Sequence, residues 1–425
     1  MLIVGGTYHE LCFHPGWDTV QGSGMRAAAA LAASEPQLTT AVDDELAIGA
    51  ELVANAVGVA ERVVVARSEP VAFEYFTPLS IPRVVGTTAT VGEVLRGDAD
   101  VALTFGMLET VEREIRAKRL VLDPQQPAGR NSLERGGLVS DELALVLNAT
   151  EARVFGKSPD LDIAVGRLIR ETGAVAVVVK AGASGADVHV ATPGGDVQTT
   201  HVPAFPTGRV WPLGSGDTFA AGFAHAWGES GADPVEAARV GSAAAAYWCS
   251  TQNHALPEEI LSGNLTRMAA IGLVPLESGV GDQDPRVYLA GPFFSLGEIL
   301  LVELARDALT AQGVSVFSPF HDVGLGDASV AQKDIDGLNQ CGSVLALLDG
   351  SDFGTVFETG YAERAEIPCV GYASSPDKEG AKMFAGLSGE LHTDFSTAVY
   401  RAAWRALGAS RAGATHRVGE ESLGD

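Results

Sequence analysis

The stretch that most constrains this chain is Arg209–Gly228, which reads RVWPLGSGDTFAAGFAHAWG. At its centre a small, flexible turn, GSGD, leads directly into an apolar segment with helical character, Thr218–Trp227. A glycine-rich turn that opens a helix directs free backbone N–H groups at one point, and the helix dipole adds partial positive charge there. Such a turn suits a phosphate, and the Asp217 carboxylate at its edge could take a proton from an attacking hydroxyl. A helix start with packing glycines and an early acid would give the same four residues.

The sequence GSGDTFAAGF resembles the C-terminal signature of the ribokinase-like (PfkB) carbohydrate and nucleoside kinases, and the resemblance extends from the N-terminus to about residue 260. It implies a ribokinase-like α/β sandwich with a small β lid, for which Val63–Ala66, Val71–Phe76 and Arg83–Val85 are candidate strands. It also implies an anion hole at Gly214, Ser215 and Gly216, and a catalytic base at Asp217. The early Asp and both Thr of the family signature are replaced by Trp211, Pro212 and Leu213, which leaves activation by a monovalent cation open.

Composition sets limits on partners. With 425 residues, 46% of them hydrophobic, the chain is long enough for two or three domains of ~150 residues. The net charge of -25 argues against binding nucleic-acid polymers or anionic membranes, whereas a small anionic substrate needs only a local basic pocket. The four cysteines show no C-x-x-C spacing, and no apolar run reaches the ~18 residues of a membrane span. We therefore expect reduced thiols in a cytoplasmic protein.

The substrate end of the kinase-like segment departs from the family pattern. A first strand, Met1–Val4, ends in Gly5-Gly6, and Glu10 is the best match to the family Asp that binds sugar hydroxyls. The resemblance also assigns Gly22 and Gly24 to the sugar-binding signature, but its first Gly is Gln21 here. Its Asn is Arg26, and a guanidinium there would suit a substrate carboxylate or phosphate. A loop acid at 10 and a surface arginine at 26 are the alternatives.

Two further motifs indicate where ATP and Mg²⁺ would bind. Asn148 and Glu151 follow the apolar run Leu143–Leu147, and in the family this N-x-x-E element positions Mg²⁺ through water. An N-cap with Glu at the third helical position would show the same spacing. Lys180, Gly182 and Gly185 follow the strand Ala174–Val179 and resemble the turn that lies along the nucleotide phosphates.

A second segment begins after a polar, glycine-rich linker that ends at Pro285. From Arg286 onward, strands and helices alternate through Val344–Leu348 and Pro368–Tyr372. The motifs YLAGPFF, SPFHDVG and DGSDFGTVFETGYA resemble those of the nucleoside 2-deoxyribosyltransferases, which implies a flavodoxin-like or Rossmannoid doubly wound parallel sheet. We expect a kinase domain at 1–272, a linker at 273–285, a transferase domain at 286–408 and a disordered tail at 409–425.

This second resemblance names a set of acids. Glu358 falls on the nucleophile that attacks the anomeric carbon, Asp334 on the acid that protonates the leaving base, and Tyr288 on the residue that orients the nucleophile. Asp352 falls on the ligand of the sugar 5′-hydroxyl, and Gly291 and Phe293 on the substrate-binding turn. Glycosidic cleavage needs an ionised and a protonated carboxyl whose pKa values are set apart, and these acids could supply them. Loop and cap acids of an acidic protein are the alternative. A C-terminal Asn that the family's neighbouring subunit usually donates has no obvious match near Lys382–Phe384.

The sequence therefore predicts a bifunctional enzyme of nucleotide salvage that uses ATP and Mg²⁺. One half would phosphorylate a sugar or nucleoside hydroxyl, and the other would transfer a deoxyribosyl group between nucleobases. In a first alternative the kinase-like half only binds a nucleotide or sugar and regulates the other half. In a second, water rather than a base resolves the glycosyl-Glu358 ester, which makes that half a hydrolase. Since both families commonly self-associate, we expect a homo-oligomer.

Overall fold

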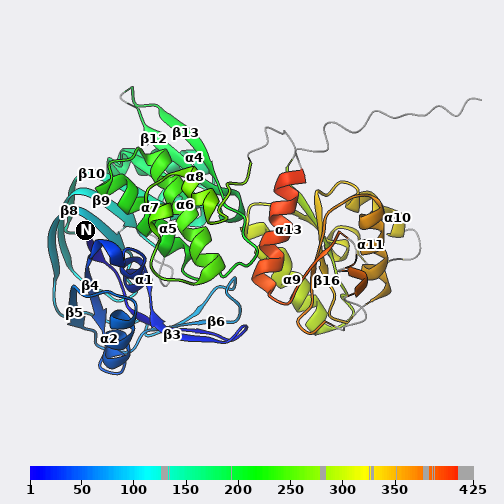
Figure 1. Ribbon diagram of the computed structural model, residues 1–425, viewed down its shortest axis with the longest axis horizontal. Helices are drawn as coiled ribbons and strands as arrows, with labels where there is room; N and C mark the ends of the chain where they lie inside the picture. Colours follow the sequence, from blue (N-terminus) through cyan, green and yellow to red (C-terminus); the bar gives the residue numbers. More distant parts are fainter. Residues whose placement is uncertain are drawn as a thin grey trace, which may run out of the picture. The chain divides into compact units, whose positions relative to one another are not determined.

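The computed structural model describes residues 1–125, 133, 135–192, 194–277, 284–324, 326, 330–350, 352–376, 382–384, 386 and 388–409. They form two compact units (Figure 1): Met1–Pro275 apart from Gly182–Ser184, called the first unit, and the chain from Leu276 onward, called the second unit. Within the expected linker and tail, residues 278–283 and 410–425 lie outside the described residues.

A nine-stranded sheet spans the described part of the first unit. Seven neighbouring strands are parallel, and two antiparallel strands extend one edge. Parallel strands place the loops that follow them along one edge of the sheet, where α/β proteins bind ligands. The order is β13 (Val197–Pro203), β12 (Gly185–Ala191), β11 (Ala176–Lys180), β10 (Leu138–Asn148), β9 (Arg113–Asp123), β8 (Leu95–Phe105), β1 (Leu2–Val4), β4 (Gln37–Val42) and β5 (Arg62–Ala66).

Helices cover both faces of this sheet because its central strands are apolar on both sides. Alternate residues of β11 belong to different layers: Val178 packs in one core cluster and Val177 in the other. The first cluster includes residues of α1 (Ser23–Ala30), α2 (Ala47–Ala56), α5 (Ser215–Ala224), α6 (Pro234–Thr251), α7 (Glu258–Leu261) and α8 (Leu265–Ala270). The second includes residues of α3 (Ala149–Phe155) and α4 (Leu161–Thr172).

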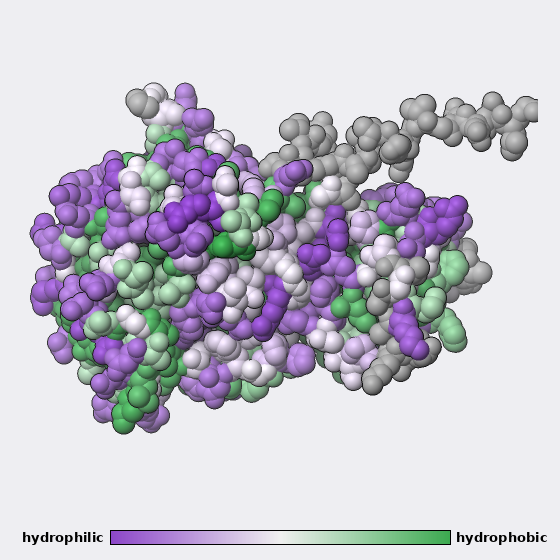
Figure 2. All heavy atoms as spheres, in the orientation of Figure 1, coloured by the Kyte–Doolittle hydropathy of each residue, from purple (hydrophilic) through white to green (hydrophobic). Residues whose placement is uncertain are grey.

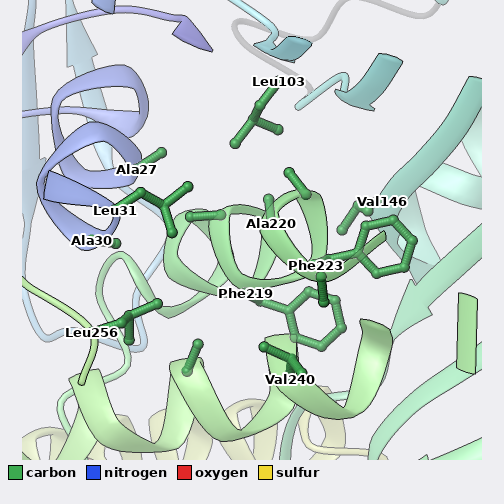
Figure 3. Packing of buried hydrophobic residues seen from close by; sticks show 14 of the residues in the cluster. Ala27, Ala30, Leu31, Leu103, Val146, Phe219, Ala220, Phe223, Val240 and Leu256 are labelled. Atoms are coloured by element: carbon green, nitrogen blue, oxygen red, sulfur yellow. The ribbon is translucent and has the colours of Figure 1, made fainter. Parts of the chain in front are cut away.

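Helix α5 lies within the first layer and is buried along its length from Asp217 onward. Its Phe219 and Phe223 share a cluster with Val240 of α6 and Val146 of β10 (Figure 3). A wider helical turn, η4 (His225–Glu229), continues the helix. The predicted helical segment after the GSGD turn is therefore a core element, so its first turn is held in place by packing.

A separate four-stranded sheet forms the lid, with the order β3 (Trp17–Gln21), β2 (Tyr8–Cys12), β6 (Ala72–Tyr75) and β7 (Arg83–Val85). The expectation that Val63–Ala66 belongs to the lid was wrong, because this segment is β5 and pairs in parallel with β4 at the edge of the large sheet. A second hairpin strand takes its place: β3 pairs with β2, which carries Glu10.

A buried ionic network holds the start of β2. Arg67 pairs with Asp43 at 2.6 Å and donates to the carbonyl oxygen of Thr7 at 3.1 Å. The Tyr8 hydroxyl donates to Glu109 at 2.7 Å. Since buried charges are stable only when paired, this network fixes the strand from which Glu10 projects.

Glycines allow the start of α1 to approach the end of β1. A Cβ atom on Gly24 would lie 2.6 Å from the carbonyl oxygen of Gly5, and one on Gly22 would lie 2.6 Å from that of Gly6. Gly22 also has φ +86°, in the left-handed region that favours glycine. These contacts bring Arg26, one turn into the helix, to the end of the first strand.

The described part of the second unit holds a five-stranded parallel sheet with the order β15 (Ser315–Phe317), β14 (Arg286–Ala290), β16 (Ser343–Leu347), β17 (Cys369–Tyr372) and β18 (Glu390–His392). In order of sequence this is 2-1-3-4-5, the flavodoxin-like arrangement that was expected. Helices α9 (Leu296–Ala311) and α13 (Phe395–Ala409) pack on one side, and α10 (Val330–Leu338) and α11 (Phe353–Arg364) on the other (Figure 1). The order of strands reverses between β14 and β16, so ligands are expected there.

Three features of the structure bear on the expectations from composition. Among the described residues, no helix combines the length and apolar character needed to cross a membrane. Apolar side chains nevertheless reach the surface over α2 (Figure 2), where Ile48 is 74% and Leu52 65% exposed. Cys249, Cys341 and Cys369 are free thiols and are buried.

Replacing Phe223 by Ala should destabilise the first unit by about 3–5 kcal/mol, because the ring is fully buried and its loss leaves a cavity. Urea unfolding measures the change. Ile48→Ala is the matched control, since this side chain is largely exposed and its loss should change stability by less than about 0.5 kcal/mol. Equal effects of the two substitutions would contradict the packing described for α5.

Candidate functional sites

The first turn of α5 opens into a cavity of about 410 Å³ in the first unit, the α5 cavity. Its walls come from the ends of parallel strands and from the lid. Of the predicted residues it is lined by Glu10, Gly22, Arg26, Asn148, Glu151, Lys180, Gly214, Gly216 and Asp217. Ser215, Gly24, Gly182 and Gly185 are not among its lining residues. The fold thus brings together residues that lie up to about 200 positions apart in the chain.

Backbone geometry explains the glycine at the start of the GSGD turn. Gly214 is the N-cap of α5 and has φ +83°, a left-handed conformation that side chains disfavour. The indole N–H of Trp248 donates to the carbonyl oxygen of Leu213 at 2.8 Å, which fixes the residue before the turn. Asp217 follows in the first helical turn. The N–H of Ser215 donates to the carbonyl oxygen of Pro212 at 3.0 Å, whereas those of Gly216 and Asp217 have no intrahelical partner and can bind an anion.

Arg26 joins the two acids of the α5 cavity. Its Nη1 donates to Asp217 Oδ2 at 2.6 Å and its Nη2 to Glu10 Oε2 at 2.5 Å. The other oxygen of Glu10 accepts from the backbone N–H of Gly22 at 3.0 Å. All three side chains are buried: the exposed fraction is 3% for Arg26, 4% for Glu10 and 8% for Asp217. The alternatives of a loop acid and a surface arginine do not describe residues 10 and 26.

Arg26 is also held from its other sides. Its guanidinium lies 5.5 Å from the ring centre of Trp248, and a Cβ on Gly214 would lie 2.1 Å from its Nε. The second oxygen of Asp217 accepts from Gln125 Nε2 at 3.0 Å. Burial disfavours the charged guanidinium, but the two carboxylates outweigh this effect and raise the pKa of Arg26. The cation is therefore fixed by the protein's own acids.

A second ion pair faces the same turn. Lys180 Nζ donates to Asp123 Oδ2 at 2.7 Å, and it would lie 3.2 Å from a Cβ on Gly216. Burial raises the pKa of Asp123 to about 7, although Lys180 acts in the opposite direction. Burial alone would lower the pKa of Lys180, but Asp123 and Glu151 outweigh it and raise that pKa. Arg26 and Lys180 thus place two positive charges beside the turn.

Asn148 and Glu151 form a capping box at the start of α3. Asn148 Oδ1 accepts from the N–H of Glu151 at 2.9 Å, and Glu151 accepts from the N–H of Asn148 at 2.8 Å. The structural role that the spacing allowed is therefore real, and both residues also line the α5 cavity. Within the described ranges, no group of three or more His, Cys, Asp or Glu is arranged to hold a metal ion directly. Glu151 and the unpartnered Oδ1 of the buried Asp123 are oxygen donors of the kind that hydrated Mg²⁺ accepts.

In the second unit, two predicted residues meet at the switch point of the sheet. The hydroxyl of Tyr288, on β14, donates to Glu358 Oε1, on α11, at 2.7 Å. Burial raises the pKa of Glu358 to about 7; the hydrogen bond from Tyr288 opposes the shift, and Asp334 and Asp352 add to it. The Tyr288 ring is fully buried and stacks on Phe317 at 5.5 Å, so core packing sets the position of the hydroxyl.

The two other acids differ in how they are used. Asp334, on α10, has an Oδ1 atom that is buried without a hydrogen-bond partner, and burial raises the pKa of this carboxyl. A protonated acid in such a place would be a proton donor. Asp352 is the N-cap of α11, where it accepts from the N–H of Gly354 at 2.7 Å and from both the N–H and the hydroxyl of Thr355. It therefore begins the helix that carries Glu358.

The substrate-turn residues Gly291 and Phe293 lie just after β14. A Cβ on Gly291 would lie 3.0 Å from that of Leu347, so the glycine lets β16 pack closely. Phe293 packs against Phe294 and Phe320, with ring centres 5.2 Å and 5.3 Å away. These rings form an aromatic wall at the carboxyl ends of β14 and β15.

Three of the residues that sequence reasoning missed in the α5 cavity are Asp123, Gln125 and Tyr75. Asp123 and Gln125 follow the buried run of β9, and their position at the end of a parallel strand was a usable signal. Tyr75 comes from β6 of the lid, and no local pattern marks it as part of a cavity.

Two family models match the chain, one in each of the two units. Residues 140–260 match the model described as pfkB family carbohydrate kinase. Residues 287–394 match the model described as nucleoside 2-deoxyribosyltransferase. Both resemblances are confirmed. The pfkB match spans Asn148 to Asp217, and the deoxyribosyltransferase match spans Tyr288 to Glu358. Both family names are those of enzymes.

None of the curated proteins matches the sequence. Among solved structures, the chain is similar to ribokinase from Arabidopsis thaliana complexed with ribose and ATP, with 15% identity and a TM-score of 0.44 over 62% of this chain and 97% of that one. It is also similar to ribokinase from Thermotoga maritima, with 17% identity and a TM-score of 0.42 over 63% of this chain and 97% of that one.

Glu358→Gln should stabilise the protein at pH 8 but not at pH 5. A carboxyl whose pKa is about 7 in the folded state and lower in the unfolded state disfavours folding once it ionises, so stability falls as pH rises through this window. Glutamine cannot ionise and escapes the loss. Thermal unfolding at both pH values measures the difference. Asp307→Asn, an exposed acid on α9, is the control and should show no such pH dependence.

Proposed function

We propose that the first unit transfers the γ-phosphoryl group of ATP to a hydroxyl of a sugar or nucleoside, and that the second unit cleaves or transfers a 2-deoxyribosyl group. The observation that supports the kinase activity is the position of Asp217 at the helix N-terminus in the α5 cavity, opposite Glu10 and flanked by Arg26 and Lys180. The observation that supports the glycosyl transfer is the hydrogen bond between Tyr288 and Glu358, beside an acid of raised pKa.

In the kinase reaction, the Asp217 carboxylate would accept the proton of the acceptor hydroxyl as that oxygen attacks phosphorus. Each of its oxygens already accepts one hydrogen bond, from Arg26 or Gln125, and retains a second lone pair. The N–H groups of Gly216 and Asp217, together with the charge of Lys180, would stabilise the negative charge on the migrating phosphoryl group. Asn148 and Glu151 would hold the waters of Mg²⁺, which supplies charge neutralisation to the phosphates when bound.

Asp217→Asn should lower the rate of acceptor-dependent ADP release at least 1,000-fold. The amide cannot take the proton, and loss of the carboxylate removes a negative charge from the acceptor site. The assay follows ADP over a panel of pentoses and nucleosides. Asp233→Asn, at the exposed N-cap of α6, is the matched control and should keep the wild-type rate. Unchanged ADP release in the Asp217 variant would exclude this residue as the base.

In the glycosyl reaction, an ionised Glu358 oxygen would attack the anomeric carbon while the bond to the nucleobase breaks and Asp334 donates a proton to the base. Tyr288 would hold Glu358 in position and stabilise its charge. The resulting glycosyl ester on Glu358 is then released by a second base, which makes the enzyme a transferase, or by water, which makes it a hydrolase. Product analysis with and without an acceptor base distinguishes these two outcomes.

Glu358→Ala should abolish base release from 2′-deoxynucleosides, since no nucleophile remains.

Asp334→Asn gives a sharper test with a nucleoside whose base leaves without protonation. The residual activity of this variant should rise with pH, because the only ionisation that the reaction then requires is that of Glu358. The midpoint should lie slightly below 7, because Asp334, which helps to raise the pKa of Glu358, is no longer charged. Base release that is independent of pH between 5 and 8 would contradict the assignment of Glu358.

A second candidate function has one observation in its favour. Both oxygens of Asp217 accept hydrogen bonds from the protein's own side chains, and a carboxylate held in this way could be purely structural. The first unit would then bind a nucleotide or sugar and regulate the second. Binding of ATP in calorimetry without ADP release over the acceptor panel would favour this function over the kinase.

A further inference from the structure

We infer that the α5 cavity takes an acceptor that is uncharged or cationic, and that the Glu10–Arg26–Asp217 cluster excludes acceptors that carry a phosphate or carboxylate near the reacting hydroxyl. This inference rests on the proposed kinase function of the same site. It reverses the expectation from sequence that a guanidinium at position 26 would attract a substrate anion.

The positive charge of Arg26 is already balanced by two carboxylates of the protein. Its two terminal nitrogens each donate to a carboxylate, at 2.6 Å and 2.5 Å. A further donor, Nε, is buried without a partner and faces the backbone of Gly214, where a single added carbon would be 2.1 Å away. No substrate atom can therefore reach Nε without moving the turn.

An incoming anion would either be repelled by both carboxylates beside Arg26 or have to displace one of them. The side chains of Glu10 and Asp217 are only 6% and 11% exposed, so a displaced carboxylate would remain in a place of low polarity without its partner. Removing one member of a buried ion pair is strongly unfavourable for this reason. The anion would gain one contact with Arg26 and leave one charge uncompensated.

The charges that line the cavity also disfavour an anionic acceptor. Four carboxylates (Glu10, Asp123, Glu151 and Asp217) face two cations, Arg26 and Lys180. Lys180 is itself paired with Asp123 and lies on the side of the turn at Gly216. Around Arg26 alone, two carboxylates surround one guanidinium. The acceptor end thus has a surplus of negative charge, which repels an anion and tolerates an ammonium group.

The same groups suit neutral hydroxyls. A carboxylate oxygen that already accepts one hydrogen bond can accept another from a hydroxyl. Because Glu10 and Asp217 are held at the two ends of one planar guanidinium, two hydroxyls of one small ring could reach both acids. Phe73 and Tyr75 from the lid supply an aromatic wall for the carbon face of such a ring.

The test compares acceptors that differ only in charge. Calorimetry in the presence of a non-hydrolysable ATP analogue measures the affinities of D-ribose and D-ribose 5-phosphate, uridine and its 5′-monophosphate, and D-glucose, D-glucosamine and D-gluconate. We expect at least one neutral or cationic compound to bind, at least ten-fold more tightly than its anionic relative. Equal or tighter binding of the anionic relative, or no detectable binding of any neutral or cationic compound, would overturn the inference.

Glu10→Gln tests the role of the cluster. It removes one negative charge and leaves Arg26 with one carboxylate, so the neutral-to-anionic affinity ratio should fall at least ten-fold, mainly through tighter binding of the anion. Glu74→Gln removes the same charge from β6 of the lid, outside the cavity, and should leave the ratio unchanged. A Glu10→Gln variant that keeps its fold by circular dichroism and keeps the wild-type ratio would overturn the assignment to this cluster.

ADP release is read separately. If the neutral compounds bind with the expected preference but none yields ADP, the kinase proposal fails and the assignment of acceptor charge stands. If ADP is formed most efficiently with an anionic acceptor, the kinase proposal stands and the inference fails.

Discussion

Burial of parallel strands on both faces is the constraint on which the rest of this structure depends. A buried apolar run, such as Leu143–Leu147 at the end of β10 or Val344–Leu347 in β16, leaves room for polar groups only beyond its carboxyl end. Both units obey this rule independently. In the first, Asp123, Asn148 and Lys180 lie at the ends of neighbouring strands. In the second, the aromatic wall lies just beyond the ends of β14 and β15. Chemistry is concentrated at one edge because packing excludes it from the rest of the sheet.

The two candidate sites treat buried acids in different ways. In the α5 cavity, Arg26 and Lys180 each form ion pairs with carboxylates of the chain itself. In the second unit, no cation is recorded beside Glu358 among the described residues. Its partner is the Tyr288 hydroxyl, and burial raises the pKa of Glu358 to about 7. The first arrangement favours a permanently charged cluster. The second favours a group that changes charge under ordinary conditions, as a nucleophile paired with a proton donor requires.

Much of the fold could be read from the sequence, because the signals were local. Apolar β-branched runs predicted the buried halves of strands, and the GSGD turn predicted the start of α5. The strands β8 to β10 nevertheless begin well before their apolar runs: β8 starts at Leu95, whereas its apolar run starts at Val101. The segment RGDAD between these points is polar and glycine-containing, so its pairing depends on the neighbouring strand and not on its own propensity. The same reason explains the lid, where β3 is recognisable only by its pairing with β2.

The candidate sites were predictable as sets of residues but not as arrangements. Motif positions gave Glu10, Arg26 and Asp217 separately, and nothing in their spacing indicated that one guanidinium would join the two acids. That contact depends on the close approach of Gly24 to Gly5, a packing relation between segments that sequence periodicity does not contain. Likewise, the capping role of Asp352 and its contribution to Glu358 become visible only when α11 is built. Local motifs specify chemistry, and long-range packing decides which groups neutralise one another.

The approach of two glycines at the beginning of α1 also limits how this protein can diverge. Gly5 and Gly24 contact each other through backbone atoms, and Phe105 lies at the same point, so neither position has space even for a methyl group. The wall of the α5 cavity that this helix forms cannot be shifted by exchanging those residues. Relatives that share this backbone and differ in acceptor preference would therefore have to differ in the side chains that project from it, above all in the side chain at position 26.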